Sequence, residues 1–173
     1  MTPSFHPYPA EGREVARITD YQQLKEQIMG LSQTDPWFVP FLSNAAAALY
    51  EELEDINWAG FYLMREGRLV LGPFQGKTAC IHIEIGKGVC GSVVAQNRII
   101  RVEDVHEFPG HIACDAASRS EIVLPLRDSS GKILGVLDID SPLTGRFTEE
   151  DQQGLAPIAD FIGRTMQIPV TSL

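Results

Sequence analysis

The sequence has little positive charge and no long hydrophobic run. Its 14 Lys and Arg residues face 23 Asp and Glu residues, so the formal net charge is -9. Such a chain repels a phosphate backbone, and we do not expect nucleic acid as a partner. No apolar run approaches the roughly 18 residues of a membrane helix, so we expect no membrane partner either. Residues 1–17 lack the apolar core of a signal peptide, and we expect a cytoplasmic protein.

Cysteine is also scarce, with only Cys80, Cys90 and Cys114 in the chain. An odd number in a reducing compartment argues against a disulfide framework, so chemistry or burial has to explain each one. Cys90 lies in the small, apolar segment GVCGSVV and fits a small buried hydrophobe equally well. Cys114 lies in a loop between His111 and Arg119, whose positive charges favour a reactive thiolate. The alternative for Cys114 is an incidental surface thiol.

A zinc site is a further alternative. The pairs Cys80-x-His82 and His111-x-x-Cys114 would offer four ligands of suitable type. On a strand, however, the two side chains of Cys-x-His stand about 6 to 7 Å apart along one face. Neither pair has the Cys-x-x-Cys form of a zinc knuckle. We therefore expect no bound metal.

The hydrophobic pattern changes along the chain and predicts one α+β domain. Residues 1–17 hold three prolines and no periodicity, which is typical of an extended N-terminal arm. Apolar residues then recur at helical spacing, and after Asn57 short strand-like runs alternate with glycines. We expect a central antiparallel sheet flanked by helices. The domain is assigned to residues 18–166 and a C-terminal tail to 167–173.

Four helices are expected in this pattern. One is capped by Thr19 or Asp20, one follows Pro36 and runs through NAAAALYEELEDI, a short one lies in GVCGSVVAQN, and the last is capped by Thr148. Pro157 lies inside the last pattern and could kink or break that helix. The expected strands are WAGFYLMR, RLVLGPFQG, CIHIEIG, RIIRVED, SEIVLPLRD and ILGVLDID.

Carboxylates occur in strands that would otherwise be apolar. Side chains alternate along a strand, so Asp138 and Asp140 in GVLDID point to one face together with Val136. In SEIVLPL the same alternation places Glu121 with Val123. The short connection between these two strands makes them neighbours in the sheet. We therefore expect Glu121 beside the two aspartates.

Aromatic residues follow the same alternation. Trp58 and Tyr62 share one face of WAGFYL, while Cys80, His82 and Glu84 share one face of CIHIEI and the three isoleucines point inward. A face that is both acidic and aromatic is typical of a cation pocket, and a solvated sheet face is the alternative. Clustered carboxylates in a partly dry site need a cation or a proton. An amino-acid ammonium group would supply the first, and a protonated carboxyl could donate to a reacting oxygen.

Five segments taken in order resemble the free methionine-R-sulfoxide reductases, which are built on a GAF domain. They are INWAGFYL, LVLGPFQGKTACIHIEIGKGVCG, HIACDAASRSEIVLPL, GVLDIDS and GRFTEEDQQGL. The resemblance covers about residues 19–163 and is specific, because a generic GAF ligand sensor lacks these cysteines in this order. It implies a GAF-like fold and the thiol-dependent reduction of free L-methionine (R)-S-oxide to L-methionine.

The resemblance also assigns the cysteines. It implies that the Cys114 thiolate attacks the sulfoxide sulfur and is left as sulfenic acid, which Cys80 converts to a disulfide. Cys90 matches the third family cysteine, implicated in substrate binding or in an alternative disulfide. Thioredoxin is the implied reductant of the disulfide, with no other cofactor, and the implied assembly is a homodimer.

The remaining implied site residues are those of the acidic and aromatic face. Glu121, Asp138 and Asp140 match the residues that hold the substrate and assist protonation of its oxygen, while Trp58 and Tyr62 match the wall that receives the methyl group. Two other functions stay open at this point. One is a non-catalytic GAF sensor of a small ligand, and the other is a thiol redox switch without a small substrate.

Overall fold

Residues 19–109 and 117–169 are described in the computed structural model of this chain, so the predicted arm at 1–17 lies outside the described residues. The order of helices and strands confirms the α+β class. Among the described residues, no helix combines the length and apolar character that crossing a membrane requires. The elements are α1 (Tyr21–Thr34), α2 (Phe38–Glu52), β1 (Trp58–Arg65), β2 (Arg68–Gly76), β3 (His82–Ile83), α3 (Gly88–Gln96), β4 (Ile100–Val102), a 3-10 helix (Val105–Glu107), β5 (Ser120–Arg127), β6 (Ile133–Ser141) and α4 (Glu149–Thr165).

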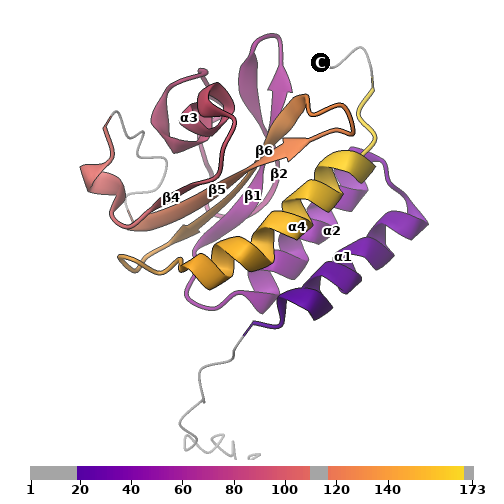
Figure 1. Ribbon diagram of the computed structural model, residues 1–173, viewed down its shortest axis with the longest axis horizontal. Coiled ribbons are helices and arrows are strands. Elements are labelled where there is room, and N and C mark those ends of the chain that lie inside the picture. Colours follow the sequence, from indigo (N-terminus) through magenta and orange to yellow (C-terminus); the bar gives the residue numbers. More distant parts are fainter. Residues whose placement is uncertain (1–18, 110–116, 170–173) are drawn as a thin grey trace, which may run out of the picture.

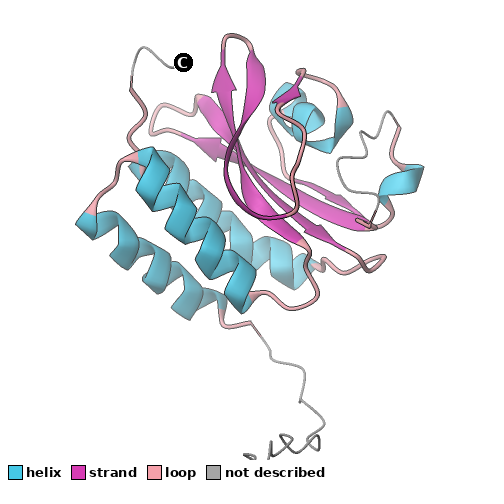
Figure 2. Ribbon diagram, turned by 180° about the vertical axis from the view of Figure 1, so that it is seen from behind, coloured by secondary structure: helices cyan, strands magenta, loops and turns pink. Residues whose placement is uncertain are grey.

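One sheet divides the molecule into two unequal layers (Figure 1). Its strand order is β3-β2-β1-β6-β5-β4, with antiparallel neighbours as expected. Helices α1, α2 and α4 cover one face, and the short α3 lies on the other (Figures 1 and 2). Ile122, Leu124 and Leu137 point into the three-helix layer and are at most 1% exposed. The alternation predicted for β5 and β6 is therefore confirmed, and it leaves their opposite face to α3.

Local signals place most element boundaries as predicted. The Asp20 carboxylate accepts a hydrogen bond from Gln23 N–H at 2.9 Å and begins α1, while Thr148 caps α4 in a capping box. α2 ends at Glu52, before the end that the sequence predicts. α4 runs unbroken through Pro157, because the proline lies on the exposed side of the helix, where water can satisfy the carbonyl that loses its partner.

The segment CIHIEIG differs from the prediction. Only His82 and Ile83 pair with β2, and the side chains of Ile81 and Ile85 are 63% and 36% exposed. The expectation that all three isoleucines point inward is wrong, since Ile83 alone is buried. Alternation holds only where a strand ladder fixes the backbone, and here the ladder spans two residues before Gly86, at φ +81, turns the chain toward α3.

The chain after α4 returns to the start of α2. Gln167 forms an isolated parallel bridge with Trp37. Phe38 N–H donates to the Gln167 carbonyl at 3.1 Å, and Gln167 N–H donates to the Pro36 carbonyl at 2.9 Å. These bonds tie the end of the helical layer together. The bounds 18–166 for the domain stay a prediction.

Candidate active site

A pocket lies on the α3 side of the sheet. It is formed by β1, β5, β6 and the first turn of α3, together with the segment before β3. Six of the eight site residues named from the sequence line it. They are Trp58, Tyr62, Cys90, Glu121, Asp138 and Asp140.

Strand register brings the acidic residues together. Glu121 lies directly opposite Asp140 in the β5–β6 ladder. Asp138 lies two residues from Asp140 along β6 and therefore on the same face of the sheet. The pairing of β1 with β6 sets Trp58 opposite Asp140. The predicted meeting of Glu121 with the two aspartates is therefore confirmed. The aromatic residues join them because β1 is the other neighbour of β6.

Two buried aromatic rings form one wall of the pocket. Trp58 and Tyr62 stack with ring centroids 5.9 Å apart, and Phe74 stacks on Trp58 at 5.2 Å. Trp58 Nε1–H donates to the Lys77 carbonyl at 3.1 Å, and the Tyr62 hydroxyl donates to the Cys80 carbonyl at 3.1 Å. The polar ends of both rings are thus held by backbone carbonyls. The wall offers the pocket its apolar surface.

Gly60 makes this stacking possible. It lies between Trp58 and Tyr62 on the same face of β1. A Cβ at this position would lie 2.3 Å from Phe74 Cβ and 2.7 Å from the Trp58 ring. Any other residue here would push the aromatic rings apart.

Burial dominates the electrostatics of the acidic side. Glu121 and Asp138 are each 6% exposed, and neither forms an ion pair with a described residue. Burial, with the charges of Asp138 and Asp140, raises the pKa of Glu121 well above its ordinary value. Burial raises the pKa of Asp138 to about 6, and the neighbouring Cys90 and Glu121 act against this rise. Burial and the neighbouring carboxylates thus favour the protonated form of Glu121.

Cys90 adds a thiol to this acidic group. Its Sγ–H donates to Asp138 Oδ2 at 3.3 Å, while Asp138 Oδ1 is buried without a hydrogen-bond partner among the described residues. Burial and the charges of Asp138 and Glu121 raise the pKa of the Cys90 thiol. One ligand atom each from Cys90, Glu121 and Asp138 lie within 4.8 Å of one another, close enough for a cation to bridge. The group can hold a positive charge or share protons.

The other two cysteines differ from Cys90. Cys80 is disulfide-bonded, whereas Cys90 is a buried free thiol. Cys80 is partly buried at the edge of the cluster that forms the pocket walls. Cys114 lies outside the described residues, as does His111.

The sequence reasoning missed several lining residues, of which Ser118 is the most informative. It is 5% exposed, and its hydroxyl oxygen accepts a hydrogen bond from Asn57 Nδ2–H at 3.2 Å. Asn57 and Ser118 both lie in segments that carry the family resemblance, but no chemical pattern singled them out. Gly88 and Val89 also line the pocket, and only the docking of α3 could reveal that.

The fold and the site define a class, an α+β domain with a pocket between its sheet and a short helix. The GAF domain family model matches residues 41–167. A free methionine-R-sulfoxide reductase of Escherichia coli K12 is 58% identical over 135 residues, which are 78% of this chain and 81% of that protein. The chain belongs to the GAF domain family and, within it, to the free methionine-R-sulfoxide reductases, as its segments predicted.

Two solved structures extend the comparison. The structure of fRMsr of Staphylococcus aureus in complex with substrate is 48% identical, with a TM-score of 0.81, over 87% of this chain and 97% of that one. The structure of the free methionine-R-sulfoxide reductase of Neisseria meningitidis with its substrate is 41% identical, with a TM-score of 0.79, over 83% and 86%.

Proposed function

We propose that this protein reduces free L-methionine (R)-S-oxide to L-methionine and binds it in the pocket between α3 and the sheet. The observation that carries the proposal is the pair Glu121 and Asp138, which lie buried beside an aromatic wall and form no ion pair with a described residue. The α-ammonium group of a free amino acid supplies the positive charge that this pair lacks. The similar proteins named free methionine-R-sulfoxide reductase support the same substrate.

The pocket favours the free amino acid over a methionine inside a peptide. A peptide nitrogen is an uncharged amide, so it cannot compensate the charge of Asp138, which lines the pocket. A site with buried polar groups rejects a ligand that leaves them unpaired. The rings of Trp58 and Tyr62 receive the methyl group and the side chain of the substrate.

In the proposed reaction, sulfur chemistry and proton delivery come from different residues. The Cys114 thiolate attacks the sulfoxide sulfur and takes its oxygen, so that methionine leaves and Cys114 becomes sulfenic acid. Glu121 gives its proton to the sulfoxide oxygen as the S–O bond breaks, because burial raises its pKa and favours its protonated form. Cys80 then condenses with the sulfenic acid, which releases water and forms a disulfide.

The state of the cysteines supports this assignment. Cys80 is disulfide-bonded and Cys90 is free, as expected if Cys80 and Cys114 are the redox pair. A dithiol reductant has to reopen that bond, and thioredoxin is the one we propose. We propose no prosthetic group, a cytoplasmic location and a homodimer, as the family resemblance implies.

One experiment tests the function. The protein is incubated with dithiothreitol and, separately, the R and S epimers of free methionine sulfoxide, and the methionine produced is quantified. We expect methionine from the R epimer, almost none from N-acetylmethionine sulfoxide, and none with Cys114→Ser. Methionine from neither epimer, or full activity of C114S, would contradict the proposal. A bridge between Cys80 and Cys114 after peroxide, without any methionine formation, would indicate a thiol redox switch instead.

A further inference from the structure

Cys90 is the one cysteine whose surroundings are described completely. It lies in the first turn of α3, 3% exposed, and its thiol points at Asp138 on β6 at 3.3 Å. Asp138 is itself 6% exposed, so both partners are shielded from water. A hydrogen bond between buried groups fixes the orientation of a carboxyl better than one exposed to competing water.

The two oxygens of Asp138 differ in their surroundings. Oδ2 accepts from the Cys90 thiol, while Oδ1 is buried without a partner among the described residues. A buried acceptor without a donor is unfavourable by about 1 to 3 kcal/mol, and more for a charged group. Asp138 also lines the pocket. A ligand donor at Oδ1 would satisfy this atom.

We propose that Cys90 is a positioning residue, whose thiol proton occupies Asp138 Oδ2 and leaves Oδ1 to accept the substrate's ammonium group. This inference rests on the proposed function. It gives Cys90 a role different from a disulfide partner of Cys114 or Cys80. A disulfide partner has to act as a thiolate, whereas a positioning donor has to keep its proton.

The charges around the thiol favour the protonated form. Asp138 and Asp140 of β6 and Glu121 of β5 face it, and Tyr62 of β1 lines the same pocket. The carboxylates among them raise the pKa of the Cys90 thiol in addition to burial. Lys87, at the start of α3, is the lysine that lines the pocket, and it is exposed. Cys90 therefore remains a donor across the range in which Asp138 is charged.

Three variants test this role. Cys90→Ala removes the donor, and Cys90→Ser keeps a hydroxyl donor on a shorter bond. Val93→Ala is the matched control, because Val93 is a fully buried residue of the same helix and cluster and has no contact with Asp138 among the hydrogen bonds described. Circular dichroism and thermal unfolding establish that each variant is folded. The assays are first-turnover methionine yield without reductant, and kcat and KM with dithiothreitol as a function of pH.

We expect Cys90→Ala to raise KM about tenfold with a smaller change in kcat, because substrate binding is weakened before the chemical step. The thiol hydrogen bond lowers the pKa of Asp138, so its loss moves the acid limb of kcat/KM to higher pH. Cys90→Ser should restore most of the affinity and of the pH profile. The first-turnover yield should stay at one methionine per chain.

Two results would overturn the inference. If Cys90→Ser and Cys90→Ala lose multiple turnover equally while keeping the first turnover, Cys90 is a redox cysteine. If KM and the acid limb of Cys90→Ala match those of Val93→Ala, Cys90 only fills space. Infrared spectroscopy of the Cys90 S–H stretch gives a readout without changing Cys90, since Asp138→Ala should shift the band if the thiol donates to Asp138. An inactive wild-type protein would refute the function, whereas an active one with these results refutes only the inference.

Discussion

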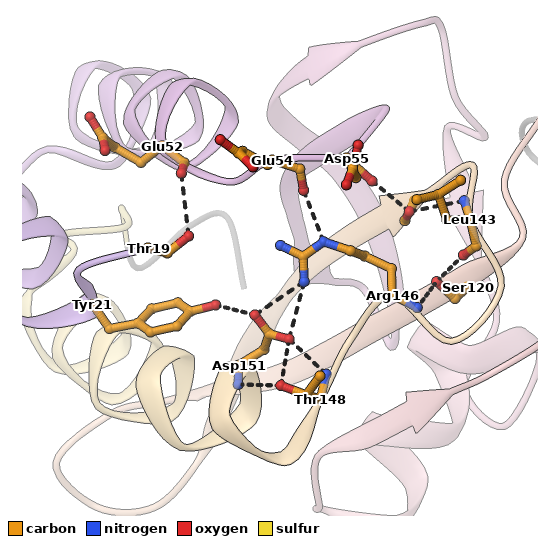
Figure 3. A network of polar contacts seen from close by, with 11 residues as sticks. Thr19, Tyr21, Glu52, Glu54, Asp55, Ser120, Leu143, Arg146, Thr148 and Asp151 are labelled. Atoms are coloured by element: carbon orange, nitrogen blue, oxygen red, sulfur yellow. Dashed lines mark hydrogen bonds and ion pairs between the residues drawn. The ribbon is translucent and has the colours of Figure 1, made fainter. Parts of the chain in front are cut away.

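Asp138 and Asp151 are both buried aspartates, yet their surroundings differ in one respect. Asp151 accepts hydrogen bonds from Arg146 Nη1 at 3.1 and 3.2 Å, from the Thr148 backbone and hydroxyl at 2.6 and 2.8 Å, and from the Tyr21 hydroxyl (Figure 3). Burial alone would raise the pKa of Asp151, but these donors and the Arg146 charge lower it. Asp138 forms no ion pair with a described residue, and burial raises its pKa.

Asp151 is thus a carboxylate that stabilises the fold, whereas we propose that Asp138 binds a ligand. Arg146 also donates from Nε to the Glu54 carbonyl at 2.9 Å, so the Asp151 group joins α1, the chain after α2 and the start of α4 (Figure 3). All of its partners belong to the chain. Glu121 and Asp138 form no ion pair with a described residue, and we propose that their cation arrives with the substrate.

The largest effect on stability should come from Asp151→Ala. Removing the carboxylate leaves Arg146, whose side chain is 16% exposed, without its partner. Breaking such a pair lowers the free energy of unfolding by about 3 kcal/mol. We expect this loss in urea denaturation, with kcat and KM of the folded fraction preserved. A large loss of activity at unchanged stability would show that Asp151 also serves the pocket.

Glu121→Gln should have the opposite profile. The amide keeps the shape of the side chain but cannot give up a proton to the leaving oxygen, so kcat should fall about 100-fold at saturating substrate. The free energy of unfolding at pH 7 should stay the same or rise, because position 121 no longer buries a carboxyl group. Steady-state assays with dithiothreitol and urea denaturation measure the two effects. Near wild-type kcat would assign proton delivery to another group.

Stability should depend on pH in opposite directions at the two sites. The pKa of Asp138 is raised to about 6 in the folded protein, so its contribution is fully present below its unfolded pKa and is lost as pH rises through about 6. The pKa of Asp151 is lowered, so its contribution is lost as pH falls. The free energy of unfolding of Asp138→Asn, relative to that of wild type, should therefore increase by about 1 to 3 kcal/mol between pH 4 and pH 7. Urea denaturation at several pH values checks this, and a constant difference would contradict it.

The smallest effect expected is that of Tyr21→Phe. This change removes one hydrogen-bond donor from Asp151 and keeps Arg146 and Thr148 in place. The free energy of unfolding should therefore fall by about 1 kcal/mol. Tyr62→Phe is the matched change on the pocket side, since that hydroxyl donates to the Cys80 carbonyl. Thermal unfolding of both variants, with activity, separates the two sites. A Tyr21→Phe protein with impaired activity and normal stability would go against the comparison.

The sequence predicts the acidic face well because side-chain alternation and a short hairpin are local properties. It could not show that Trp58 faces Asp140, since the pairing of β1 with β6 joins segments that are distant along the chain. The alternation in CIHIEI misled for Ile81 and Ile85, where the strand ladder is too short to hold the pattern.

The contacts of Asp138 and Asp151 could likewise be predicted from the sequence only where they are local. The Thr148 cap follows from its position before an acidic helical turn. Arg146 and Tyr21 contact Asp151, and the Cys90 thiol contacts Asp138. These contacts depend on how the helices dock on the sheet. Cys90 could be interpreted as a small buried residue or as a third redox cysteine. Its hydrogen bond to Asp138 became visible only in the fold.

The packing at Gly60 limits how the pocket can be redesigned. A methyl group added there would collide with the Trp58 ring and with Cα and Cβ of Phe74, so this position of β1 has no room for a side chain. The first turn of α3, with Val89, lies on another side of the pocket. An engineer who wants to accept a longer sulfoxide should therefore shorten residues on the helix and leave the strand untouched.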